Sequence, residues 1–329
     1  MFFMSADDIL ASFSFSGVIG SVEETMVDME SSPDSMVAPP RNSFSFGDNS
    51  LITMPCLSQR EWGLKILTLF PDNPIRKKPF INGLFLLFDG SDGRLSALLD
   101  GRTLTALRTG GVGGLAVRTL SKEGVKRLGV VGAGDQGFWQ ARFACSVRNF
   151  SKVVFFDTEI SKAKTCARRI QELLPDLNIS IAEDATALLK SSDVVITATT
   201  NTSTPLFRCS PSSFKGKTLI GIGSYRPDMR EYPDTVFQGV SEVFVDSKHA
   251  LDETGDLIHP LRSGIIKRER IKTLGSLLLS PDKRVDHLSG SLFKSVGFAA
   301  FDLYVARHIL KRALKLGRGT ELGGIKTIF

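Results

Sequence analysis

A glycine-rich turn is the strongest sign of chemistry in this sequence. Residues 132–137 read Gly-Ala-Gly-Asp-Gln-Gly, directly after the apolar run 127–131 and before a helical pattern. Glycines at these spacings let a strand-to-helix turn tighten and let a pyrophosphate approach the N–H groups at the helix start. An acidic residue about 20 positions further on normally meets the ribose, and Asp157 follows the next apolar run. The pattern predicts a dinucleotide site.

Asp157 also indicates which dinucleotide is bound. A carboxylate there accepts hydrogen bonds from two ribose hydroxyls and repels a 2′-phosphate. Lys162, Lys164 and Arg168 follow closely and are able to meet such a phosphate. We therefore expect NAD(H), with NADP(H) as the alternative.

Three cations in the amino-terminal part suggest a second kind of chemistry. Arg41 follows Pro39-Pro40, Lys65 lies in a strand-like run, and Arg108 precedes a glycine-rich helical segment. Taken singly, each is typical of a solvated surface. Arginine offers a two-pronged donor to a carboxylate, and a buried lysine can exchange protons near neutral pH. Together the three predict a pocket for an anion or carboxylate.

The elements that must position these residues fall into two patterns. Residues 42–100 contain short β-rich runs separated by Asp-Asn-Pro and Asp-Gly turn signals, which favours an antiparallel, strand-rich segment. Helices are expected over 5–32, opened by a Ser-x-x-acid capping box, and over 104–120, where four glycines would permit close packing.

After Ser121 the chain alternates between strands and helices, as parallel βαβ units do. The sequence therefore predicts an α/β fold with a Rossmann-type doubly wound sheet and a strand-rich α+β region. The expected strands are 127–131, 153–156, 179–182, 194–198, 218–222 and 243–246, and the expected helices extend from the glycine-rich turn to Val147 and over 160–174 and 185–189.

Composition excludes several functional classes. The 329 residues are 42% hydrophobic and 23% charged, as in folded globular proteins, and the net charge of +6 is scattered rather than clustered, which disfavours nucleic-acid binding. No apolar run reaches the ~20 residues of a membrane span, and no signal peptide is recognisable, so we expect a cytoplasmic protein. The four cysteines and four histidines lack zinc-site spacing, so free thiols and no metal are expected.

Six motifs in a fixed order resemble the ornithine cyclodeaminase/mu-crystallin family and cover the chain from about Pro39 to Ala306. They are Gly63-Leu-Lys-Ile-Leu-Thr-Leu-Phe-Pro-Asp-Asn73, Leu107-Arg-Thr-Gly-Gly111, Gly132-Ala-Gly-Asp-Gln136, Gly223-Ser-Tyr-Arg-Pro-Asp-Met-Arg-Glu231, Val245-Asp-Ser247 with Glu253-Thr-Gly-Asp256, and Phe293-Lys-Ser-Val-Gly297 with Asp302.

The resemblance implies a homodimer with a substrate-binding and dimerisation domain over 1–115, completed by about 303–329, and a Rossmann domain over 116–302. It implies that Arg41, Lys65 and Arg108 hold the substrate carboxylate and that Lys65 protonates or orients an imine nitrogen. The residues implied for the cofactor are Thr109, Gly132, Ala133, Gly134, Asp135, Gln136 and Gly137 around the pyrophosphate, Asp157 and Thr158 at the ribose, and Thr199, Thr200 and Ile222 on the nicotinamide side.

One departure from the family pattern bears on the reaction. Family members that cyclodeaminate ornithine, and similar alanine dehydrogenases, carry an aspartate where this chain has Tyr225. A carboxylate there can hold an α-ammonium group or activate water, whereas a phenol with a pKa near ~10 does neither well. Asp228 follows a proline and is expected in a turn or helix start.

The leading interpretation is an NAD(P)H-dependent reductase of a cyclic imino acid, such as piperideine-2-carboxylate or pyrroline-2-carboxylate. The alternatives are an ornithine cyclodeaminase, a related amino-acid dehydrogenase, and a non-catalytic, crystallin-like protein that binds nucleotide and a small molecule. Asp246 and Asp256 are expected to be structural and Asp302 to be a helix residue, whereas Lys294 and Ser295 are candidate neighbours of the nicotinamide.

Overall fold

The computed structural model describes residues 1–201, 205–282 and 285–323. The chain divides into two compact units: Met1–Arg108 with the carboxyl-terminal segment from Phe298 forms unit 1, and Thr109–Gly297 forms unit 2. The boundaries expected from the sequence, after residues 115 and 302, lie slightly later. The first observed boundary falls inside α3 (Gly101–Leu120), a continuous helix that no sequence signal divides.

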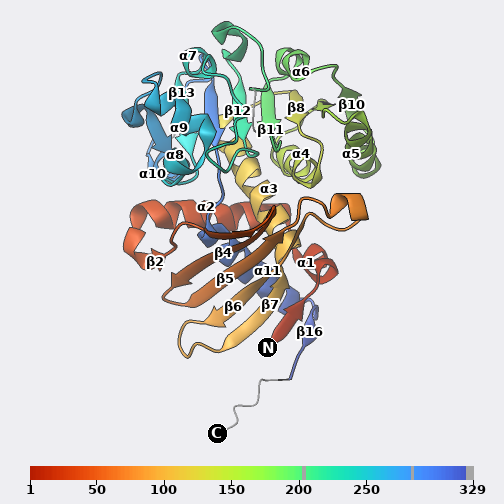
Figure 1. Cartoon of the computed structure of the whole chain (residues 1–329), viewed down its shortest axis with the longest axis vertical. Coiled ribbons are helices and arrows are strands. Elements are labelled where there is room, and N and C mark those ends of the chain that lie inside the picture. Colours follow the sequence, from red (N-terminus) through yellow and green to blue (C-terminus); the bar gives the residue numbers. More distant parts are fainter. Residues whose placement is uncertain (202–204, 283–284, 324–329) are drawn as a thin grey trace. The chain divides into compact units, whose positions relative to one another are not determined.

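Unit 1 is built on a largely antiparallel sheet in the order β16-β1-β7-β6-β5-β4-β2, with β3 also paired to β4 (Figure 1). The antiparallel strands expected over 42–100 are confirmed, whereas the pairing of β1 with β7 is parallel. The strands are β1 (Phe2–Met4), β2 (Met36–Val37), β3 (Asn42–Phe46), β4 (Asn49–Ser58), β5 (Glu61–Leu69), β6 (Ile81–Asp89), β7 (Leu95–Asp100) and β16 (Thr320–Glu321).

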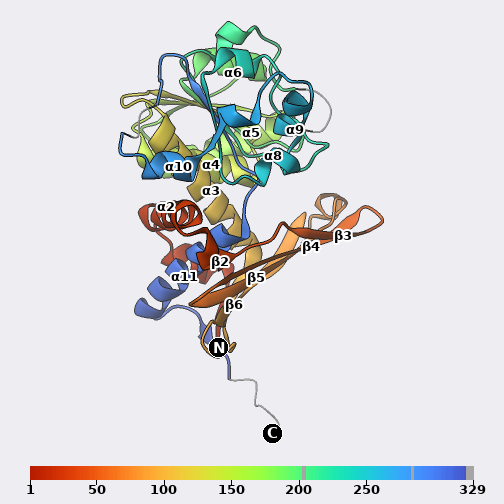
Figure 2. The same ribbon diagram turned by 90° about the vertical axis from the view of Figure 1, so that its left-hand side faces the viewer.

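Helices cover one face of the long strands in unit 1. α11 (Ala299–Lys315) packs on β4, β5 and β6 and also contacts α1 (Ala6–Ser12) and α2 (Phe15–Ser31), as Figure 2 shows. The core side chains alternate along each strand, as a sheet with one covered face requires. Short 3₁₀ turns lie at Pro33–Ser35 and Pro74–Arg76.

The single helical segment expected over 5–32 is wrong in one respect. The predicted capping box is present, since Asp8 N donates to Ser5 Oγ and Ser5 N donates to Asp8 Oδ2. However, α1 ends at Ser12 and Ser14 caps a separate helix, α2. Ser14 accepts a hydrogen bond from Gly17 N, a local competition with the helix that weak periodicity does not reveal.

Unit 2 is a wholly parallel sheet in the order β10-β9-β8-β11-β12-β15-β13-β14. Helices surround it (Figure 1), and β11, β12 and β15 are buried along their whole length. The strands are β8 (Arg127–Val131), β9 (Lys152–Phe156), β10 (Asn178–Ile181), β11 (Val194–Thr197), β12 (Thr218–Gly221), β13 (Glu242–Val245), β14 (Ile271–Thr273) and β15 (Ser291–Lys294).

The predicted βαβ alternation is confirmed, but β14 and β15 were not expected. β15 comes last in unit 2 and inserts between β12 and β13, a placement that its four residues, Ser-Leu-Phe-Lys, do not predict. The helices are α4 (Asp135–Val147), α5 (Ile160–Leu173), α6 (Ala185–Ser191), α7 (Val236–Gly239), α8 (Ala250–Glu253), α9 (Gly255–Arg262) and α10 (Leu274–Leu279), with 3₁₀ turns at Pro211–Phe214 and Arg268–Arg270.

The glycines of α3 allow α4 to approach closely, as the sequence suggested. A Cβ on Gly110 would lie 2.4 Å from the Phe143 ring, and one on Gly113 would lie 1.8 Å from Gln140 Oε1. Gln140 Nε2 donates to the carbonyl of Thr109 at 2.8 Å. Glycine lowers the intrinsic stability of α3, but it allows α3 and α4 to pack closely next to the glycine-rich turn.

In the described part of the chain, no helix combines the length and apolar character needed to cross a membrane.

Candidate active site

Lys65 occupies the core face of unit 1. The alternation of β5 buries Gly63, Lys65 and Leu67 on the same face. In register with Lys65 are Met54 on β4 and Phe85 on β6, both buried. A lysine in this apolar row is fully buried, so its ammonium group requires a counter-charge.

Asp302 provides that counter-charge from the first turn of α11. Its Oδ2 lies 2.6 Å from Lys65 Nζ, and its Oδ1 lies 3.3 Å from Arg108 Nε. All three side chains are buried. One carboxylate therefore serves two cations that are brought together from β5 and α3.

The electrostatics of this cluster adapt Lys65 to proton transfer. The pKa of Lys65 is lowered from 10.5 to about 7. Burial is the largest cause, the charges of Arg108 and Arg41 act in the same direction, and Asp302 opposes them. Arg41, half buried in the loop before β3, contributes to this lowering of the Lys65 pKa through its charge. Three cations and one carboxylate make this region of unit 1 attractive to an anion, and Lys65 can change protonation near neutral pH.

Sequence reasoning missed Asp302. It was expected only as a helix residue, because a single aspartate in an amphipathic helix gives no local sign of what it faces, and its place in a helix is confirmed. Its complete burial and its ion pairs with Lys65 and Arg108 place it in the cluster instead. The family motif contained this residue, but its role depended on a contact across 237 positions of sequence.

The glycine-rich turn of unit 2 joins β8 to α4 as predicted (Figure 1). Gly132 has φ +92°, and a Cβ there would lie 2.5 Å from the Ala198 carbonyl oxygen. A Cβ on Gly137 would lie 1.9 Å from the carbonyl oxygen of Gly132. Both glycines are therefore required by the turn itself, whether or not a ligand binds.

Gly134 differs, because it has open space beside its Cα. A Cβ on Gly134 would meet no atom within 4 Å, and both Gly134 and Asp135 are exposed. The first intrahelical bond runs from Phe138 N to Gly134 O, so the N–H groups of residues 135–137 precede the hydrogen-bonded series. A bare glycine beside exposed helix-start N–H groups fits a pyrophosphate.

Asp157 lies against the same turn, where its Oδ2 accepts a hydrogen bond of 2.8 Å from Ala133 N and its Oδ1 accepts one from Glu159 N. Thr158 is exposed next to it. Of the neighbouring cations, Lys162 pairs with Glu159 at 2.6 Å and Arg168 lies 4.0 Å from Glu172. These pairings compete with any 2′-phosphate for the two cations.

The residues expected on the nicotinamide side follow β11 and β12. Thr199 N and Oγ1 donate to Glu231 Oε1 at 2.8 and 2.9 Å, and Thr200 beyond it is exposed. Ile222 is buried after β12, and its N–H donates to Thr197 O. The structure thus places Thr199 and Ile222 at the same sheet edge as the glycine-rich turn and reveals Glu231, which sequence reasoning did not select.

Neither Tyr225 nor Asp228, the two residues weighed above for deamination, is fully buried. Tyr225 is half buried, with the guanidinium of Arg226 5.9 Å from its ring centre. Asp228 lies in an exposed turn and pairs with Arg226 at 3.1 Å. The turn expected at Asp228 is confirmed, and its carboxylate is solvated rather than held beside a reacting group.

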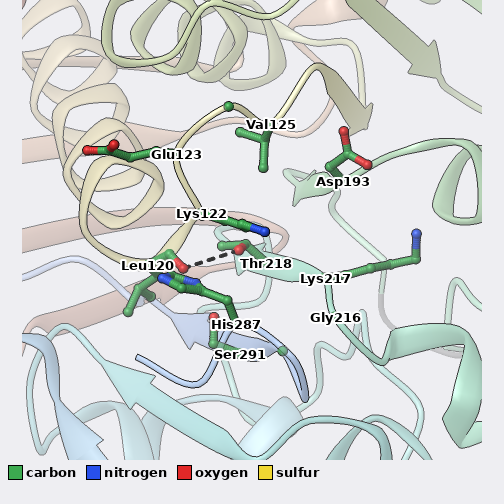
Figure 3. A pocket seen from close by; sticks show the side chains of 12 residues that line it. Leu120, Lys122, Glu123, Val125, Asp193, Gly216, Lys217, Thr218, His287 and Ser291 are labelled. Atoms are coloured by element: carbon green, nitrogen blue, oxygen red, sulfur yellow. Dashed lines mark hydrogen bonds between the residues drawn. The ribbon is translucent and has the colours of Figure 1, made fainter. Parts of the chain in front are cut away.

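A hollow of about 290 Å³ lies at the opposite edge of the unit 2 sheet, where β12 and β15 begin (Figure 3). Its lining contains Lys122, Glu123, Asp193 and Lys217, two cations and two carboxylates. Lys217 Nζ already donates to the Ser192 carbonyl at 2.6 Å. The formal charges of these four side chains cancel and Lys217 is already engaged, so the hollow offers no net charge to an anion.

Comparison with known proteins agrees with this geometry. A model of the ornithine cyclodeaminase/mu-crystallin family matches residues 2–317. The chain belongs to this family.

Three relatives illustrate its neighbourhood within the family. A delta(1)-pyrroline-2-carboxylate reductase of Bacillus cereus is 34% identical over 300 residues, covering 89% of this chain and 91% of the relative. An iminosuccinate reductase of Paracoccus denitrificans is 27% identical over 263 residues, 79% of each chain. The structure of Thermococcus litoralis delta(1)-pyrroline-2-carboxylate reductase in complex with NADH and L-proline superposes with a TM-score of 0.90, at 28% identity, over 98% of this chain and 100% of that one.

Proposed function

We propose that this protein is an NAD(H)-dependent reductase of a cyclic imino acid, with pyrroline-2-carboxylate as the substrate class tested first. The observation that carries the proposal is the buried cluster of Lys65, Asp302 and Arg108. The cluster combines a proton donor near neutral pH with cations. These suit the two polar groups of an imino acid, its imine nitrogen and its carboxylate. The relatives named as pyrroline-2-carboxylate reductases support the same chemistry.

Each residue of the cluster has a role in this reaction. Arg41 and Arg108 bind the substrate carboxylate, because guanidinium groups match its two oxygens. Lys65 keeps the imine nitrogen protonated, which makes the C=N carbon a better hydride acceptor. Asp302 holds the Lys65 ammonium group in place and is a positioning residue.

The nucleotide is assigned to unit 2. Gly134, Asp135 and Gln136 would hold the pyrophosphate, Thr109 would lie beside the same turn, Asp157 and Thr158 would hold the ribose, and Thr199, Thr200 and Ile222 would adjoin the nicotinamide. When bound, a reduced nicotinamide supplies the hydride that is added to the imine carbon. NAD(H) is favoured over NADP(H) because Asp157 lies against the turn and Lys162 and Arg168 have acidic partners.

A homodimer is part of the proposal. The unit 1 sheet has α11 on one face (Figure 2), and exposed apolar side chains lie on adjacent strands at positions that alternate with the buried core residues, where a second copy of the chain would cover them. They include Phe44 and Phe46 on β3, Leu51 on β4 and Trp62 on β5. Light scattering should give twice the chain mass at micromolar concentration, and a monomer would contradict this part.

The decisive assay follows the absorbance of the reduced nicotinamide. We expect rapid oxidation of NADH with pyrroline-2-carboxylate or piperideine-2-carboxylate, and no release of ammonia from L-ornithine. Ammonia from ornithine would instead assign cyclodeamination, in spite of Tyr225. Tight nucleotide binding without turnover of any imino or amino acid would favour a binding protein.

The pH dependence should report Lys65. Because the pKa of Lys65 is lowered to about 7, its protonated form is lost as the pH rises through that value. We expect kcat/KM for imine reduction to fall on the alkaline side of about pH 7. Because the substrate imine also titrates, the pH profile of Lys65→Met is the control. The residual activity of this variant should lack the fall near pH 7 that Lys65 causes. An unchanged profile in that variant would remove Lys65 as the titrating group.

Gly134→Ala tests the pyrophosphate position. Gly134 has φ −77° and space for a Cβ, so the substitution strains nothing in the protein alone. We expect an unchanged melting temperature and an NADH dissociation constant raised about tenfold or more, because a methyl group would stand where the backbone must approach the phosphates. Gly264→Ala, at another glycine with open space, is a comparison outside the turn, although its φ of +72° adds local strain. Normal NADH binding by Gly134→Ala would place the nucleotide elsewhere.

A further inference from the structure

The carboxylate of Glu231 binds the ends of two strands in unit 2. Its Oε1 accepts from Thr199 N and Oγ1, and its Oε2 accepts from Thr197 Oγ1 at 2.8 Å, Gly223 N at 2.9 Å and Ser224 N at 3.2 Å. Glu231 is fully buried. It joins the backbone just after β11 to the backbone just after β12, and every partner is a donor.

Glu231 belongs to a buried ionic group, here called the Glu231 cluster and defined as Glu231, Asp256 and Lys294. Lys294 Nζ lies 3.2 Å from Asp256 Oδ2 and 3.6 Å from Glu231 Oε2. Asp256 Oδ1 accepts from the N–H groups of Glu231 and Tyr232. Two carboxylates face one ammonium group, so the formal charge of the cluster is −1. All three side chains are essentially excluded from solvent.

The topology indicates which part of a nucleotide this charge faces. The order β9-β8-β11-β12 changes direction between β8 and β11, and dinucleotides bind across such a switch point at the carboxyl ends of the strands. Asp157 marks the ribose on the β9 side of the turn. The nicotinamide half therefore belongs on the β11 and β12 side, where Glu231 binds both strand ends.

We infer that the Glu231 cluster stabilises the positive charge that appears on the nicotinamide when hydride is lost. This inference rests on the proposed function. A bound reduced nicotinamide would supply the hydride and would then carry one positive charge. The hydride's electron pair would form the new C–H bond, and the π pair of the C=N bond would move to the protonated nitrogen. A fixed charge of −1 at these strand ends would favour that product state over neutral reduced nicotinamide. Glu231 is also a positioning residue for the strand ends.

The test compares the dissociation constants of NAD⁺ and NADH, measured by calorimetry without substrate. Asp256→Asn removes the net charge but retains Oδ1 as an acceptor, and Glu231→Gln removes it while placing an amide donor among donors. Both variants should weaken NAD⁺ relative to NADH by about three- to tenfold, as expected for one charge acting over on the order of 10 Å. Lys294→Met makes the cluster more negative and should shift the ratio in the opposite direction.

The matched control is Glu123→Gln, which removes the same charge at the opposite edge of the sheet, beside the hollow in Figure 3. Its NAD⁺ to NADH ratio should not change. A merely structural role would weaken both nucleotides equally in every cluster variant, and that result overturns the inference. Each variant is checked by its melting temperature, and Asp256→Asn carries the test if Glu231→Gln fails to fold. Failure of the proposed function would appear separately, as wild-type protein that binds both nucleotides but reduces no imine.

Discussion

Replacing Lys65 by methionine is expected to reduce the rate of imine reduction by about 10²- to 10⁴-fold, the usual contribution of a positioned acid or base. The side chain lies in an apolar row between Met54 and Phe85, so methionine fills the same space. Asp302 retains Arg108 as its partner in this variant. The loss should therefore appear in kcat rather than in folding.

The Lys65→Met experiment separates chemistry from nucleotide binding. Lys65 belongs to unit 1, whereas the glycine-rich turn belongs to unit 2, so the dissociation constant of NADH should remain within about twofold of wild type. Lys122→Met, at an exposed position, is the control for removing a lysine. Retention of more than about one-tenth of the wild-type kcat would show that the imine receives its proton from another source.

Asp302→Asn is expected to have the second largest effect, through pKa and stability together. The Asp302 carboxylate raises the pKa of Lys65 against the effect of burial. Without it, the Lys65 pKa must fall below about 7, so the alkaline limb of the pH–rate profile should move to lower pH. Because asparagine leaves the buried Arg108 guanidinium, and whatever fraction of Lys65 is still protonated, without a counter-charge, the free energy of unfolding should also fall, by about 3 kcal/mol.

The control for Asp302→Asn is Asp28→Asn. Asp28 accepts a hydrogen bond of 2.7 Å from Tyr304, which lies on α11 as Asp302 does. Within the described residues, Asp28 has no ion pair with Lys65. This variant should lose some stability in urea while its pH profile stays in place. If the limb failed to move in Asp302→Asn, or moved equally in Asp28→Asn, the assignment of the titrating group to the Lys65 and Asp302 pair would be wrong.

The local sequence determined much of the nucleotide half. The turn at 132–137 lies between a strand and a helix, and Asp157 accepts a hydrogen bond from it. Both could be predicted because glycine geometry and strand–helix alternation are short-range properties. The antiparallel strands over 42–100 could likewise be predicted from the sequence, because turn residues and the alternation of buried side chains are patterns of a few positions. The sequence also grouped Lys65, Arg41 and Arg108 as cations suited to a carboxylate, and the charges of both arginines lower the pKa of Lys65.

Tertiary structure alone decided which charges became partners. Asp302 and Lys65 lie 237 positions apart, and β15 inserts Lys294 between strands far from it in sequence, next to Asp256 and Glu231. An isolated aspartate, glutamate or lysine has the same local pattern on a solvated surface as in a buried cluster. Only packing removes the water, and removal of water is what makes the Lys65 pKa fall and makes each buried carboxylate act on its neighbours.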